Sequence, residues 1–85
     1  MLSKPREIVV DIDSSGSMYL SGHPTSLMEL QRLLRIAVAS NPTNQTVVFR
    51  ADRSTSFQPV VSVMDLCNKS GVSDYSVTTQ EGPQP

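Results

Sequence analysis

The chain has 85 residues, of which 38% are hydrophobic and 18% charged, and its net charge is −1. This length supports one domain with a small core, and the few scattered basic residues argue against a nucleic-acid-binding surface. The single cysteine, Cys67, excludes an internal disulfide and a cysteine-rich metal site. No run reaches the roughly 18 apolar residues that a transmembrane helix needs.

The first predicted unit is a β-hairpin. Alternation of apolar and polar residues over 7–12 predicts a half-buried strand. Residues 13–16, Asp-Ser-Ser-Gly, predict a turn, and residues 17–20 a short return strand. A loop is expected at 21–24, Ser-Gly-His-Pro. The buried face of the hairpin would hold Ile8, Val10, Ile12, Met18 and Leu20.

A helix is predicted next. Ser26 followed by Glu29 fits a capping box at its start, and Asn41-Pro42 ends it after about Ser40 because proline removes a hydrogen-bond donor. The apolar residues at helical spacing would face the core. They are Leu27, Leu30, Leu33, Leu34, Ala37 and Val38.

The second half has the predicted order strand, helix, strand. Residues 46–51 predict a strand with Val47, Phe49 and Ala51 inward, and the loop 52–56 ends at Ser56, which is expected to cap the next helix.

That second helix tolerates Pro59 in its first turn and is expected to stop at Gly71 in a left-handed conformation. Tyr75 and Val77 then alternate with polar residues in a last strand, 74–79. The predicted core stripe of the helix is Phe57, Val60, Val63, Met64 and Cys67.

These elements predict a two-layer α+β fold of order ββαβαβ. Since each strand has one apolar face and each helix one apolar stripe, we expect two helices on one face of a four-stranded mixed sheet. The domain would span residues 6–79. Residues 1–5 would be the flexible remnant of a linker, and 80–85 a disordered tail.

One segment has the residues of a metal site. Asp13, Ser15 and Ser17 match a DxSxS motif that binds a hard cation in larger adhesion domains. The residues after it cannot form the helix that such a domain requires, so a hairpin turn is the preferred interpretation. His23 is the only histidine, which is weak grounds for zinc. We expect Cys67 to be a buried, inert thiol, and we expect no catalytic, cofactor or metal site.

The order of motifs in the second half resembles a known family. Residues 49–53, Phe-Arg-Ala-Asp-Arg, are followed by Phe57, by 60–65, Val-Val-Ser-Val-Met-Asp, and by Gly71. Together they resemble the periplasmic domain of the ExbD/TolR biopolymer transport family, over roughly residues 5–79. The ending 77–80, Val-Thr-Thr-Gln, is similar to TolR, whereas the Arg-Ala-Asp segment slightly favours an ExbD type.

The resemblance implies a non-enzymatic periplasmic domain of a bacterial inner-membrane protein, acting as a homodimer. ExbD-like proteins work with an ExbB-like channel subunit and a TonB-like protein, and use the proton motive force to drive outer-membrane transport. TolR-like proteins, the alternative, work with TolQ- and TolA-like partners and can bind peptidoglycan. The parent protein would carry an N-terminal membrane helix that precedes this chain, with Met1 as a cloning start codon. The family's protonatable aspartate lies in that helix, so no aspartate here inherits its role.

Three groups of residues are candidate partner contacts. The last strand would be an exposed sheet edge, which another chain can extend; its residues are Asp74, Tyr75, Ser76, Val77, Thr78 and Thr79. The second group, which is either a recognition rim or a solvated charge cluster, is Arg50, Asp52 and Arg53. The third group, which is either a contact surface or scattered surface hydrophobes, is Met28, Ile36 and Leu66.

Overall fold

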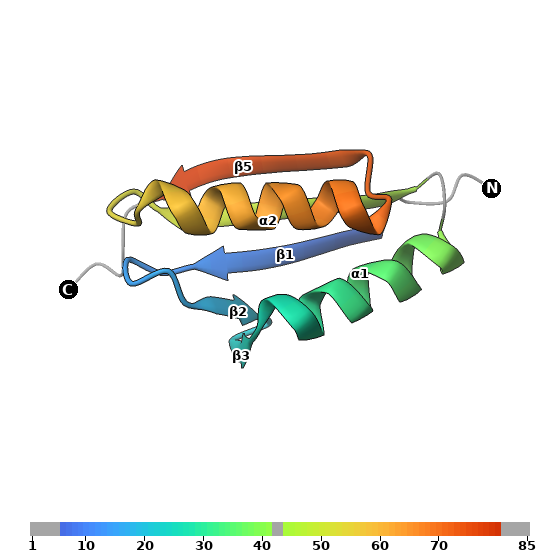
Figure 1. Cartoon of the computed structure of the whole chain (residues 1–85), viewed down its shortest axis with the longest axis horizontal. Coiled ribbons are helices and arrows are strands. Elements are labelled where there is room, and N and C mark those ends of the chain that lie inside the picture. The colour runs from blue at the N-terminus through green and yellow to red at the C-terminus, as the bar shows by residue number, and fades with distance from the viewer. Residues whose placement is uncertain (1–5, 42–43, 81–85) are drawn as a thin grey trace.

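The computed structural model describes residues 6–41 and 44–80, and Figure 1 shows their arrangement. This part of the chain forms five strands and two helices. In chain order they are β1 (Arg6–Ile12), β2 (Met18–Leu20), β3 (His23–Thr25), α1 (Leu27–Ser40), β4 (Gln45–Asp52), α2 (Phe57–Ser70) and β5 (Asp74–Gln80).

The strands form one mixed sheet in the order β3-β2-β1-β4-β5. β1, β2 and β3 are antiparallel neighbours, whereas β4 is parallel to both β1 and β5. Parallel neighbours need a crossover connection, and α1 and α2 supply the two crossovers. In the resulting register Asp11 pairs with Arg50, and Arg50 pairs with Thr78.

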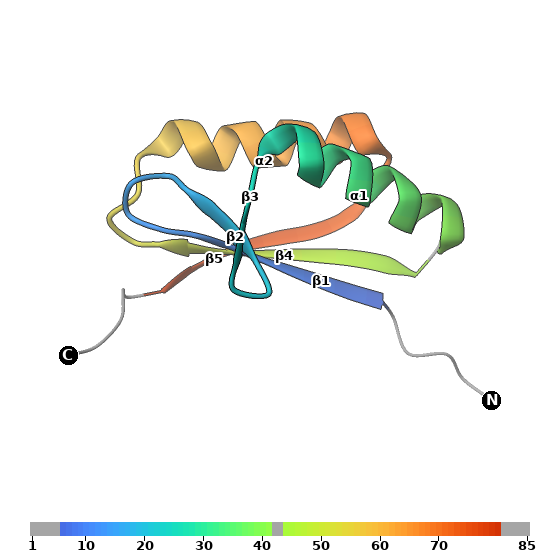
Figure 2. The same cartoon turned by 90° about the horizontal axis from the view of Figure 1, so that it is seen from below.

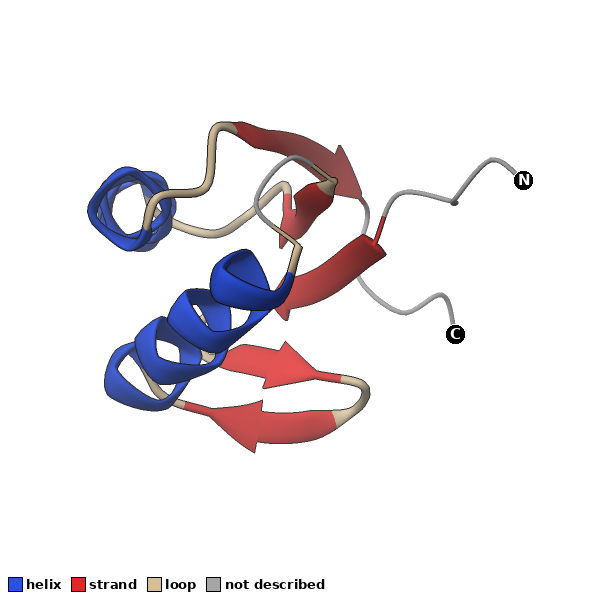
Figure 3. Cartoon of the chain, turned by 90° about the vertical axis from the view of Figure 1, so that its right-hand side faces the viewer, coloured by secondary structure: helices blue, strands red, loops and turns tan. Residues whose placement is uncertain are grey.

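Both helices pack on the same face of the sheet (Figure 2). The end view in Figure 3 shows α2 over the β4–β5 side and α1 over the side nearer the β2–β3 hairpin. Within residues 6–41 and 44–80, no helix covers the other face. The predicted two-layer α+β architecture is therefore confirmed.

The core lies between the helices and the central strands. The inward residues of β1 and β4 alternate with outward ones as predicted, because side chains along a strand point to opposite faces. Phe49, at the centre of β4, is fully buried. The buried apolar residues are Val10, Ile12, Leu30, Leu34, Val47, Phe49, Ala51, Val63, Leu66, Cys67 and Val72.

The predicted number of strands was wrong. The segment expected to be a loop contains β3, in which His23 pairs with Leu20 and Pro24 with Tyr19. The order is βββαβαβ, and the sheet has five strands. Proline is tolerated here because β3 lies at the edge of the sheet, where one side of a strand makes no ladder hydrogen bonds.

The predicted buried face of α2 was also partly wrong. Phe57 is 79% exposed and Met64 38% exposed, whereas Leu66, expected off the core, is 7% exposed. The helix has two adjacent apolar arcs, and the sheet buries the one centred between Leu66 and Cys67. In α1, Leu27 is exposed rather than buried.

The helix ends are capped as predicted, except at the start of α2. The Ser26 hydroxyl accepts a hydrogen bond from the Glu29 amide at 3.2 Å and donates one to the Glu29 carboxylate at 3.1 Å. Gly71 ends α2 with a φ of 84°, as expected. Ser56 stands at the N-cap position of α2 but makes no side-chain capping bond.

Gln80, which was expected to belong to a disordered tail, is the last residue of β5. The predicted flexible segment 1–5 and the rest of the tail lie outside the described residues.

Candidate partner-binding site

The strand β5 forms one edge of the sheet, with β4 as its neighbour. The Gln80 carbonyl accepts a hydrogen bond from the Arg53 amide at 2.9 Å, which shows that the main-chain groups of Gln80 face β4. Because successive residues of a strand direct their main-chain groups to opposite sides, those of Tyr75, Val77 and Thr79 point to the outer edge. The predicted edge position of this strand is confirmed.

The side chains of β5 divide between two faces of the sheet. Tyr75 and Val77 lie on the helix side and are half-buried against the core, whereas Ser76 and Thr78 are exposed on the other face. The Tyr75 hydroxyl donates a hydrogen bond to the Asn68 amide oxygen at 3.2 Å. This bond ties the start of β5 to the C-terminal turn of α2.

One flank of α2 runs along this edge. Asn68, which contacts β5, lies on the same side of the helix as Met64, Val60 and Phe57, since residues three or four positions apart share a face. The opposite flank, with Ser62 and Leu66, faces α1. Figure 1 shows α2 lying alongside β5. We call the row Phe57, Val60, Met64 and Asn68 the α2 flank.

The opposite edge of the sheet is much less suited to pairing. β3 has three residues, and the middle one is Pro24, which has no main-chain N–H. Short strands and prolines are two ways by which proteins prevent pairing at an edge. The seven-residue β5, which contains no proline, is therefore the edge at which another strand can be added.

Two of the charged residues after Phe49, Arg50 and Asp52, make different side-chain contacts. Arg50 pairs across the sheet with Asp11, at 2.7 Å from Nε to Oδ1 and 3.0 Å from Nη2 to Oδ2. The hydrogen bond to Asp11 and its charge raise the pKa of Arg50. Asp52 instead accepts a bond from the Ser54 amide at 2.8 Å and stabilises the loop. Sequence reasoning missed Asp11, because its place beside Arg50 depends on the parallel register.

The turn after β1 is held by one carboxylate. Asp13 Oδ1 accepts bonds from the Ser15 amide at 2.9 Å, the Ser15 hydroxyl at 2.7 Å and the Ser17 amide at 2.9 Å. Oδ2 accepts one from the Tyr19 hydroxyl at 3.2 Å. The Ser15 hydroxyl foremost, then the two amides and Tyr19, hold the pKa of Asp13 below its ordinary value. The predicted hairpin turn is confirmed.

The thiol of Cys67 is buried in the core. Burial raises the pKa of Cys67 to about 11, so the thiol is protonated at neutral pH. Among residues 6–41 and 44–80, no three His, Cys, Asp or Glu side chains are grouped to hold a metal ion.

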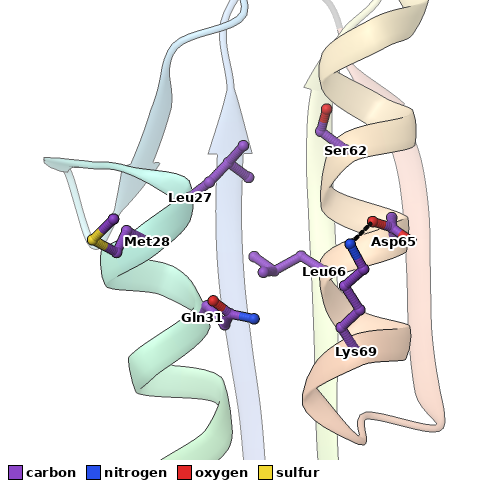
Figure 4. A pocket seen from close by; sticks show the side chains of 7 residues that line it. All are labelled: Leu27, Met28, Gln31, Ser62, Asp65, Leu66 and Lys69. Atoms are coloured by element: carbon purple, nitrogen blue, oxygen red, sulfur yellow. Dashed lines mark ion pairs between the residues drawn. The ribbon is translucent and has the colours of Figure 1, made fainter.

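A groove of about 290 Å³ lies between the two helices (Figure 4). Met28, which is 81% exposed, forms part of its wall, and the buried Leu66 extends into it from α2. Lys69 and Asp65 form an ion pair at 3.0 Å on its rim. Two of the predicted apolar contacts thus line the same groove, although the Met28 side chain points away from α2 in Figure 4. Ile36, 59% exposed, is not part of the groove's lining.

These features define a small two-layer α+β domain with β5 at one open edge of its sheet. The sequence profile of the family described as "Biopolymer transport protein ExbD/TolR" matches residues 1–82, and the chain therefore belongs to the ExbD/TolR family. A comparison with curated proteins gives no match.

The family places this chain among proteins of biopolymer transport. Its members are membrane-anchored, non-enzymatic components of energy-transducing systems and carry a periplasmic domain. In residues 6–41 and 44–80, neither helix has the length and apolar character to cross a bilayer.

Proposed function

We propose that this domain is the periplasmic interaction domain of a single-pass inner-membrane subunit in an ExbB–ExbD–TonB type complex. There it couples proton flow to outer-membrane transport by binding other proteins. Its partners are an ExbB- or TolQ-like channel subunit, a TonB- or TolA-like protein and a second copy of the chain. Family membership supports this role, and the observation that carries the binding mode is the open seven-residue edge of β5.

Binding at this edge uses main-chain groups. Tyr75, Val77 and Thr79 each direct an N–H and a C=O outward, which is the arrangement that an extended peptide needs in order to add a strand. Asp52, the last residue of β4, and Arg53 lie next to Gln80 on the inner side of β5, and we include them in the proposed contact. Met28 and Ile36 are exposed on α1 and are secondary contact candidates.

Amide hydrogen exchange tests this proposal. When a TonB-like periplasmic peptide is added, the amides of Tyr75, Val77 and Thr79 should become protected, because they gain hydrogen-bond acceptors. The amides of Ser76 and Thr78, which already face β4, are the internal control and should change much less. Unchanged exchange at Tyr75, Val77 and Thr79 in the presence of saturating peptide would refute binding at this edge.

The alternative is a TolR-like peptidoglycan-binding domain of the Tol–Pal envelope system. The observation that favours it is the TolR-like ending 77–80, all of which lies within β5. Sedimentation with insoluble peptidoglycan separates the two functions. Retention of the domain on the cell-wall pellet supports the alternative, and capture by the TonB-like peptide alone supports the first.

A further inference from the structure

The α2 flank is unusually apolar for a surface. Phe57 is 79% exposed and Met64 38% exposed, and Val60 between them is only partly buried. The flank does not face α1, since Ser62 and Leu66 occupy that side of the helix. It borders the space beside β5, where an added strand would lie.

The spacing of the flank matches that of a strand. α2 and β5 run in opposite directions, because the Asn68–Tyr75 hydrogen bond joins the end of one to the start of the other. One turn of helix, from Asn68 to Met64, advances about 6 Å. Two residues of strand, from Tyr75 to Val77, advance about 6.6–6.8 Å. By this spacing Met64 is level with Val77, and Phe57, about 16.5 Å from Asn68 along the helix, is level with Gln80 at the end of β5.

A strand added to β5 would project every second side chain towards the helix layer. Those side chains would enter the gap between the outer edge of β5 and the α2 flank, where Met64 and Phe57 offer apolar contacts. The remaining side chains would lie beside Ser76 and Thr78, which are exposed and polar. The helix-side face of the site would therefore accept apolar side chains, and the opposite face would accept small polar ones.

We infer that the β5 edge and the α2 flank form one two-part site for an extended peptide that has apolar residues at alternate positions and small polar residues between them. This inference rests on the proposed function and adds the chemical pattern of the partner segment. Main-chain hydrogen bonds to β5 hold the peptide, and the α2 flank selects its sequence.

A peptide fits this site better than a second copy of the chain does. Seven residues of β5 extend about 23 Å, and a strip of that length and about 10 Å width, the spacing between packed layers, covers a few hundred Å² per copy. A stable interface covers about 800 Å² per partner. A homodimer would need contacts beyond this strip, whereas a peptide can bind there transiently.

Two synthetic peptides test the inference. The first is Lys-Thr-Val-Thr-Val-Thr-Val-Lys with blocked ends, and the second has the same composition in the order Lys-Thr-Thr-Thr-Val-Val-Val-Lys. Binding is measured by NMR titration of the domain. The alternating peptide should bind at least about fivefold more tightly, because only its valines can all face the α2 flank.

Variants of the domain test whether the α2 flank causes this difference in affinity. Phe57→Ser and Met64→Ser should each weaken binding of the alternating peptide about fivefold. Leu27→Ser, which removes an apolar side chain that is 41% exposed on α1, is the matched control and should change the Kd less than about twofold. Thermal melting of each variant verifies that the fold is retained.

The outcomes separate this inference from the proposed function. If the alternating peptide protects the Tyr75, Val77 and Thr79 amides but both α2 variants bind it normally, the edge site stands and the α2 flank is rejected. If neither peptide protects these amides, the edge and the flank are rejected together. If the same amides become protected with rising protein concentration and no peptide, a second copy occupies the site and the peptide assignment is overturned.

Discussion

At the scale of single residues, Gly16 lies where the turn between β1 and β2 packs closely against α2. Its φ is +89°, and a Cβ atom built there would lie 2.8 Å from the Cγ of Pro59, in the first turn of α2. Gly22, in the β2–β3 turn, has a similar φ of +80° with no heavy atom within 4 Å of such a Cβ. The two glycines thus have similar positive φ angles and differ in their surroundings.

Alanine substitution should separate the cost of the positive φ angle from the cost of the close approach to Pro59. Gly22→Ala should cost about 1 kcal/mol, from the left-handed conformation alone. Gly16→Ala adds a collision with Pro59 and should cost about 2–3 kcal/mol. Urea unfolding of both variants measures the difference. Equal losses would mean that the turn and α2 move apart without strain.

At the scale of elements, the two helices begin differently although a serine precedes each. Ser26 caps α1 through its hydroxyl, whereas the Ser56 side chain makes no capping bond. Both serines are exposed, so burial does not distinguish them. The free energy of capping should therefore be present at one helix start and absent at the other.

We expect Ser26→Ala to destabilise the domain by about 1 kcal/mol. Ser56→Ala should stay within about 0.5 kcal/mol of the wild type, as do surface substitutions that remove no specific bond. Chemical denaturation monitored by circular dichroism checks both values. A loss at Ser56 as large as that at Ser26 would show that Ser56 caps α2 in solution.

The elements also show what the sequence predicts well and where it fails. β1, β4, β5 and α1 were predicted to within a residue or two, because alternation, capping residues and Gly71 are local signals. β3 was missed because Gly22 and Pro24 are typical of loops, and only pairing with β2 makes this segment a strand. The buried face of α2 was misplaced because Phe57 and Met64 are as apolar as Leu66.

The same reasons apply to the candidate site. The edge position of residues 74–79 was predictable from their place at the end of the fold. The α2 flank was not, since the exposed Phe57 and Met64 were assigned to the core. The Arg50–Asp11 pair joins residues 39 positions apart. Such contacts depend on strand order, which local patterns do not contain.

At the scale of the whole molecule, stability is concentrated in the two central strands. β1 and β4 lie in the middle of the sheet, and Phe49 is the largest fully buried side chain. A chain of this size has a free energy of unfolding of about 4–13 kcal/mol. Loss of one large core side chain is therefore a substantial part of the total.

The two phenylalanines give a direct comparison. Phe49→Ala should cost about 3–5 kcal/mol because it leaves a cavity in the core. Phe57→Ala, at an exposed position, should change stability by less than about 0.5 kcal/mol. Differential scanning calorimetry measures both. A large loss for Phe57→Ala would contradict its surface position and remove Phe57 from the partner site.

The inequality of the two sheet edges limits how large an assembly this domain can build. A chain that could pair at both β3 and β5 would polymerise, because each added molecule would present a fresh acceptor. With β3 shortened and carrying Pro24, growth ends after one addition. Edge pairing by this domain should therefore stop at one added strand per molecule, and Pro24 in β3 is one reason that pairing should not continue into a fibre.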